Sequence, residues 1–255
     1  MIRFLVLDFL ATLRERKTWL AVAMLAYAVL AVPVLLERPP EHVRDAIGEW
    51  FGDSDPFAVF MFVWIDLVMN KVVAFLPVIL ASSVLLRERD TRVLAVLASK
   101  QITMGRYFVI RTISVCAVML TLYVATQLVG ALWFRGRVAG FQPGTFLAAM
   151  SLHAFAAVFA TAFASTVIVA VGRRGAGTLV AFMLLGLLVG LALVGFYQPA
   201  WYAFTLANPL TLGALAMGQL ERLGPGVLVP PMLALLVLTA VTIAIGVRFA
   251  RRIEA

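Results

Sequence analysis

The chain has few charged side chains and little of the chemistry that enzymes or metal sites need. Of its 255 residues 13% are charged and 63% are hydrophobic, whereas globular domains are roughly 25% charged and 45–50% apolar. The single cysteine, Cys116, excludes a disulfide within the chain. Two histidines, His42 and His153, and one cysteine are too few and too scattered for a metal site, so we expect none. The composition predicts an all-α, polytopic membrane protein.

Six apolar stretches are long enough to cross a bilayer, which takes about 20 mostly apolar residues. They cover residues 19–36, 67–86, 107–134, 145–171, 178–196 and 227–247. We therefore expect one transmembrane domain over residues 1–255, with outer loops at 37–56 and 197–226. Pro77 falls inside the second stretch, where we expect it to break the span.

The basic residues predict the orientation, because Lys and Arg accumulate on the cytoplasmic side of membrane proteins. Most of them fall before the first stretch, between the second and third, between the fourth and fifth, and after the sixth. This predicts a multi-pass protein of the cytoplasmic (inner) membrane with both termini in the cytoplasm. The net charge of +8 is then a sign of topology, and we expect no nucleic-acid partner.

The first 17 residues predict a separate helix. Ile2, Leu5, Phe9, Leu10 and Leu13 recur at helical spacing, with basic residues mostly at the end of the segment. This pattern is typical of an amphipathic helix in the membrane interface. The alternative is a simple N-terminal extension of the first span.

The cytoplasmic connection 87–106 is longer than a turn between two spans requires. Glu88 and Asp90 precede a stretch of helical composition from Thr91 to Leu97, as acidic residues do at helix N-termini. A short helix under the membrane would offer an apolar and basic surface to a soluble partner. The alternative is an interfacial helix that contacts only lipid headgroups.

The order of these features resembles the ABC-2 type permeases of ATP-binding-cassette transporters. The resemblance is carried by residues 74–111, AFLPVILASSVLLRERDTRVLAVLASKQITMGRYFVIR. The positions that match the family pattern are Glu88, Thr91, Leu94, Leu97, Thr103, Gly105 and Arg106, and Asn208-Pro209 is a weaker match. The sequence departs from the pattern at Asp90 and Arg92 and at Lys100-Gln101, where a proline is usual. The six-span outline is similar to the permease that serves copper-site assembly of nitrous oxide reductase, and drug, lipid and peptide exporters share it.

The resemblance implies an exporter in which two copies of the chain pair and each rests on a separate cytoplasmic ATPase. The resemblance assigns residues 1–17 as an elbow helix and residues 87–106 as a coupling helix that the ATPase binds. The coupling residues it implies are Glu88, Asp90, Thr91, Arg92, Leu94, Leu97 and Arg106. The chain has no G-x-x-x-x-G-K-[ST] motif. We therefore expect no cofactor in this chain, with ATP and Mg bound by the partner.

Polar residues inside the predicted spans are candidates for a transport pathway, because such residues are costly in a bilayer and commonly functional. They are Asp66, Asn70 and Lys71, at or near the outer end of the second span, and His153 in the fourth. The first three would otherwise anchor the outer interface, and His153 would otherwise be a hydrogen-bonded packing residue. The chain has no H-E-x-x-H or G-x-S-x-G motif, so we expect no enzyme. The alternative function is an ion-coupled secondary transporter or channel that works without an ATPase.

Overall fold

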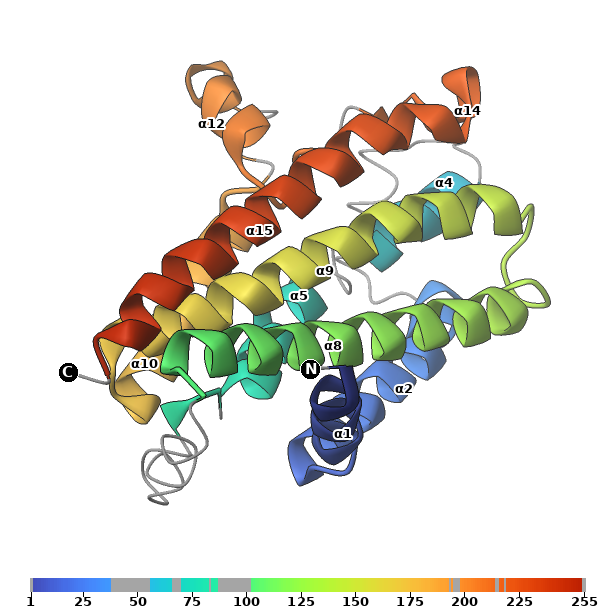
Figure 1. Ribbon diagram of the computed structural model, residues 1–255. Helices are drawn as coiled ribbons and strands as arrows, with labels where there is room; N and C mark the ends of the chain where they lie inside the picture. Colours follow the sequence, from blue (N-terminus) through green and yellow to red (C-terminus); the bar gives the residue numbers. More distant parts are fainter. Residues whose placement is uncertain are drawn as a thin grey trace.

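Helices account for nearly all of the regular structure in the part of the chain that the computed structural model describes (Figure 1). The described residues are 2–37, 56–65, 70–82, 84–86, 102–192, 194, 198–213, 216–217 and 219–253. The helices are α1 (Ile2–Leu13), α2 (Arg16–Glu37), α4 (Pro56–Phe62), α5 (Asn70–Ala81), α8 (Met104–Phe134), α9 (Pro143–Val171), α10 (Arg174–Gly190), η2 (Pro199–Trp201), α12 (Tyr202–Ala207), α14 (Leu220–Leu223), η3 (Pro225–Leu228) and α15 (Val229–Arg251).

The central element of the bundle is α9. It contacts α5, α8, α10 and α15, and Ala156, Ala160 and Ala164 are buried along it. Small residues at this spacing let neighbouring helices approach closely in a membrane. At its C-terminal end Gly172 adopts a left-handed conformation with φ 68°, which closes the helix and turns the chain into α10.

Five segments are long and apolar enough to cross a membrane: Arg16–Val34, Pro56–Ala81, Met104–Phe134, Pro143–Val171 and Pro225–Arg251. Their outward faces are apolar as well, with Leu132 78% and Val237 62% exposed. A surface of this kind suits hydrocarbon rather than water. An all-helical, membrane-embedded class of protein is therefore confirmed for the described part of the chain.

The second predicted span differs from the structure in where it begins and where it breaks. Apolar residues from Phe57 to Ile65 are helical or in a π-type turn, so the segment begins at Pro56 and not at residue 67. Phe60 and Trp64 are buried against Phe134 and Phe146, with Trp64 and Phe134 ring centroids 4.9 Å apart, and Phe57 is buried against Phe141. Pro77 does not break the span, because α5 continues through it to Ala81.

The fifth predicted span is shorter than expected. Its helix, α10, has 17 residues and ends at Gly190, short of the predicted residue 196. Asn208 folds back on this end of α10 and donates its side-chain N–H to the Leu188 carbonyl at 2.8 Å. The predicted outer loop 197–226 contains η2, α12 and α14 and the start of η3. A short amphipathic helix over residues 210–223 is also predicted from the sequence, but residues 209–213 form turns, and α14 (Leu220–Leu223) covers only its end.

The N-terminal helix is a separate element. A turn at Arg14 and Glu15 divides α1 from α2, so the alternative of a continuous first span is excluded. Figure 1 shows α1 lying against α8, and the two are in contact. The polar side chains that join them form the first of two buried clusters.

Candidate functional site

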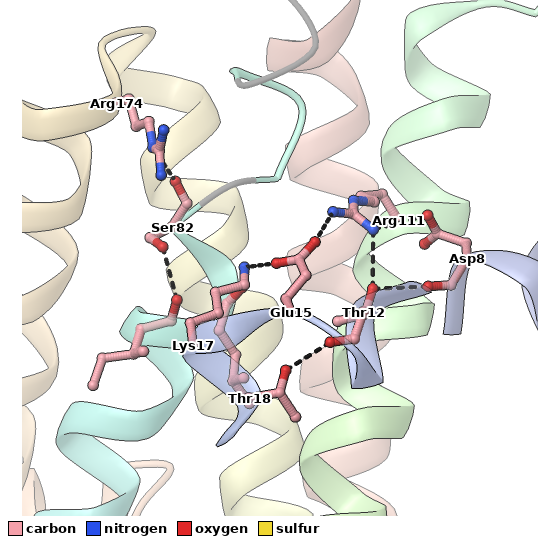
Figure 2. A network of polar contacts seen from close by, with 10 residues as sticks. Asp8, Thr12, Glu15, Lys17, Thr18, Ser82, Arg111 and Arg174 are labelled. Carbon is pink, nitrogen blue, oxygen red and sulfur yellow. Dashed lines mark hydrogen bonds and ion pairs between the residues drawn. The ribbon is translucent and has the colours of Figure 1, made fainter. Parts of the chain in front are cut away.

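The guanidinium of Arg111 is the centre of a buried network between α1, α2 and α8 (Figure 2). One of its terminal nitrogens donates to Asp8 Oδ1 at 2.8 Å and to Thr12 Oγ1 at 2.9 Å, and the other donates to Glu15 Oε1 at 3.0 Å. Arg111 is 4% exposed and Thr12 is fully buried. We call Asp8, Thr12, Glu15, Lys17 and Arg111 the Arg111 network.

The Arg111 network continues from Glu15 to the end of α5. Lys17 Nζ lies 3.2 Å from Glu15 Oε2 and donates to the Leu80 carbonyl. From the other side, Arg174 of α10 donates its Nε–H to the Ser82 carbonyl at 3.0 Å. The last carbonyls of a helix have no partner within that helix, and here two cations supply partners at the end of α5.

Electrostatics favour the ionised form of Glu15. Burial by itself raises the pKa of this carboxyl, but the nearby charges of Lys17 and Arg111 and their hydrogen bonds lower it, and the net result is below the ordinary value of 4.5. Glu15 therefore stays ionised at neutral pH and keeps both cations as partners.

The polar side of α1 faces the protein, and part of its apolar side faces outward. Asp8 and Thr12 point toward Arg111, whereas Val6, Leu7 and Leu10 are exposed. Leu5, Phe9 and Leu13 of the predicted apolar face are half-buried. The predicted amphipathic pattern holds in part, and the ion pairs of Asp8 and Glu15 with Arg111 were not predicted. The sequence feature that could have revealed these ion pairs is the spacing of Asp8, Thr12 and Glu15, which places three hydrogen-bond acceptors on one side of the corner between α1 and α2.

The second cluster lies between α5, α8 and α9, within the apolar bundle. His153 of α9 approaches Tyr123 of α8 with 2.5 Å between Nδ1 and the hydroxyl, and Asn70 of α5 with 3.0 Å between Nε2 and Oδ1. On the same side of α8, Gln127 Oε1 accepts from Trp64 Nε1 at 3.3 Å, and Met150 Sδ lies 3.3 Å from the same nitrogen. We call these six residues the His153 cluster.

These contacts fit one neutral form of His153. With the proton on Nε2, the ring donates to Asn70 and accepts from the Tyr123 hydroxyl, so both ring nitrogens have partners. His153 is 4% exposed and Tyr123 is fully buried. The cluster therefore offers a proton donor and acceptor chain across three helices, in surroundings that are otherwise apolar.

Replacing Tyr123 with Phe is expected to lower the free energy of unfolding by about 1 kcal/mol, because the buried Nδ1 of His153 loses its donor. Unfolding by SDS titration in mixed micelles measures this loss. The matched control is Tyr27→Phe, since Tyr27 is 74% exposed on α2. Equal stability of the two variants would contradict the hydrogen bond.

Two of the four predicted pathway residues come together in the structure. Asn70 and His153 are in contact, while Lys71 is exposed on α5 and takes no part in the cluster. Asp66 lies outside the described residues. Tyr123, Trp64 and Met150 were missed because aromatic and thioether side chains in a span give no sequence signal that separates them from ordinary packing.

The predicted coupling residues fall mostly outside the described part of the chain. These are Glu88, Asp90, Thr91, Arg92, Leu94 and Leu97. Arg106 is described: it is exposed in the first turn of α8, and its backbone N–H donates to the side chain of Thr103, which caps the helix.

In the described ranges, no group of three or more His, Cys, Asp or Glu side chains is placed to hold a metal ion. No family model, no curated protein and no solved structure matches the chain. The fold itself defines the class, an all-helical membrane protein with an ion-paired N-terminal helix and a buried histidine cluster.

Proposed function

We propose that this chain is the membrane-spanning permease subunit of an ATP-binding-cassette transporter of the ABC-2 type. In this proposal it exports its substrate, pairs with a second copy of itself, and is driven by a separate cytoplasmic ATPase. Its membrane is the cytoplasmic one, with both termini on the ATPase side. The resemblance over residues 74–111 and the absence of a nucleotide-binding motif in the sequence support the proposal.

The observation that carries it is the connection between the Arg111 network and the end of α5. Lys17 and Arg174 bind the carbonyls of Leu80 and Ser82, a few residues before the segment 87–106. Arg111 and Glu15 link the same point to α1, α2 and α8. A force applied to 87–106 by an ATPase would therefore reach α1, α2, α8 and α10 through hydrogen bonds and ion pairs. An interfacial segment that only touches lipid has no need of such an attachment.

A second candidate function is an ion-coupled secondary transporter or channel. The observation that favours it is the His153 cluster, because ionisable residues that are hydrogen-bonded to one another inside transmembrane helices commonly mark ion or proton pathways. Within the first proposal, the same cluster and Lys71 are candidates for the lining of the export path.

Co-purification separates the two candidates. The chain is expressed with an affinity tag from its own chromosomal locus, extracted in a mild detergent, and its companions are identified by mass spectrometry. A stoichiometric ATPase subunit and a dimer mass for the tagged chain are expected. A monomeric chain that transports in proteoliposomes with a proton gradient and no ATPase would contradict the permease proposal.

A proline substitution in the segment 87–106 is expected to uncouple ATP hydrolysis from transport. Val96→Pro prevents a continuous helix there, so ATP-dependent transport should fall at least tenfold. Glu88→Lys tests the same segment by reversing a charge. The ratio of substrate exported to ATP hydrolysed is the measurement, and Arg135→Gln at the far end of α8 is the control. An unchanged ratio in both variants would count against docking at this segment.

A further inference from the structure

An apolar groove separates α2 from α8 on the outer surface of the bundle. Its volume is about 360 Å³, and its lining is Val22, Leu25, Ala26, Val29, Leu30, Leu122, Ala125, Thr126 and Val129. The one hydroxyl in it, that of Thr126, donates to the Leu122 carbonyl at 2.8 Å. The groove therefore presents hydrocarbon surface to whatever fills it.

The position of the groove puts it in contact with the acyl chains of the membrane. Its α2 residues belong to the middle of the span Arg16–Val34, and its α8 residues belong to the span Met104–Phe134. Ala26 and Ala125, on opposite walls, are both exposed. The small side chains at these two positions leave the groove open to the side.

Charge at the corner between α1 and α2 supplies the second part of the argument. Both acids of this corner, Asp8 and Glu15, are turned inward to Arg111. The exposed charged side chains in the described residues 2–20 are all arginines: Arg3, Arg14 and Arg16. The corner therefore presents positive charge to its surroundings although its sequence contains both signs.

The distance along α2 from the arginines to the groove matches the distance from the headgroup of a phospholipid to its acyl chains. Trp19, 66% exposed, follows Arg16 by about one helical turn of α2 and precedes Val22 by about one turn. Val22 lies about 9 Å along the helix axis from Arg16. Tryptophan commonly occupies the boundary between headgroups and hydrocarbon, which places Arg14 and Arg16 at headgroup level and the groove at acyl-chain level.

We propose that this corner and groove form a binding site for an anionic phospholipid. One acyl chain lies in the groove between α2 and α8, and the phosphate pairs with Arg14 and Arg16. A second copy of the chain fits less well. A two-fold contact through this surface would bring the same exposed arginines of both copies together, and like charges oppose such a contact.

Lipid titration followed by native mass spectrometry tests the proposal. The purified, delipidated chain is titrated with phosphatidylglycerol and with phosphatidylcholine of the same acyl chains. We expect tighter binding of the anionic lipid. Arg14→Gln with Arg16→Gln should reduce that preference roughly thirtyfold, which corresponds to about 1 kcal/mol for each arginine. Arg135→Gln, an exposed arginine at the other end of α8, is the matched control and should change nothing.

Filling the groove tests the acyl-chain half of the site. Ala26→Phe with Ala125→Phe should weaken the binding of both lipids at least tenfold. Neither substitution enters the packed core, because both alanines are exposed. Val237→Phe on the exposed face of α15 is the control, and a melting curve without lipid verifies that each variant is folded. Equal affinity for the two lipids in the native chain would overturn the proposal. So would a dimer that the groove variants dissociate while leaving lipid binding intact.

Discussion

Replacing Arg111 with methionine is expected to lower the free energy of unfolding by about 3–5 kcal/mol and to release α1 from α8. Arg111 is 4% exposed, and its guanidinium binds Asp8, Thr12 and Glu15. Removing one partner of a buried ion pair leaves the remaining charges without compensation, which is the costly case. SDS titration measures the stability, and protease sensitivity near residue 14 measures the release of α1.

Two further variants distinguish the ion network from a general effect of losing an arginine. Arg135→Met removes an exposed arginine at the end of the same helix and should change stability by no more than about 0.5 kcal/mol. Adding Asp8→Asn and Glu15→Gln to Arg111→Met removes the two stranded carboxylates, so part of the lost stability should return. If Arg111→Met were as mild as Arg135→Met, the buried network would not hold α1 against α8.

A side chain at Gly246 is expected to separate α15 from α8 and α9. A Cβ atom there would lie 2.4 Å from two ring atoms of Phe108 and 2.7 Å from Thr166 Oγ1. Phe108 is fully buried, and Thr166 donates a hydrogen bond to the Thr242 carbonyl at 3.0 Å. Gly246→Val should therefore cost about 3 kcal/mol by overpacking.

The control for this prediction is Gly175→Val, because a Cβ at Gly175 meets no atom within 4 Å. Its melting temperature in detergent should stay close to that of the native chain, whereas the Gly246 variant should melt well below it. Similar melting of the two variants would mean that α15 can shift without loss, contrary to the close packing described above.

The long spans could be predicted well from the sequence, because their apolar runs end at proline, glycine or basic residues. The predicted stretches 107–134 and 145–171 correspond to Met104–Phe134 and Pro143–Val171. The second span was wrong at its start because Asp66 was taken as the boundary, although residues 57–65 are equally apolar. The fifth was too long because its helix ends where Asn208 binds the Leu188 carbonyl, a contact between residues far apart in the chain.

Some residues of the His153 cluster could be predicted from the sequence, but the contacts between them could not. The cost of polar groups in a bilayer singled out Asn70 and His153, which the structure brings to 3.0 Å. Their pairing depends on how α5 packs against α9, and no local pattern encodes that. Arg111 was not among the predicted pathway residues, because the sequence around a single arginine near the end of a span does not show whether it faces water or a buried carboxylate.

The pairing of α1 with α8 also has a consequence for the order of assembly. Arg111 follows its partner Asp8 by 103 positions and Glu15 by 96. While the chain is being synthesised, the acids of α1 emerge long before the arginine that neutralises them. The first helix to be made therefore docks only after the third long span has entered the membrane. Until then, Asp8 and Glu15 keep this helix in contact with water, where their charges are solvated.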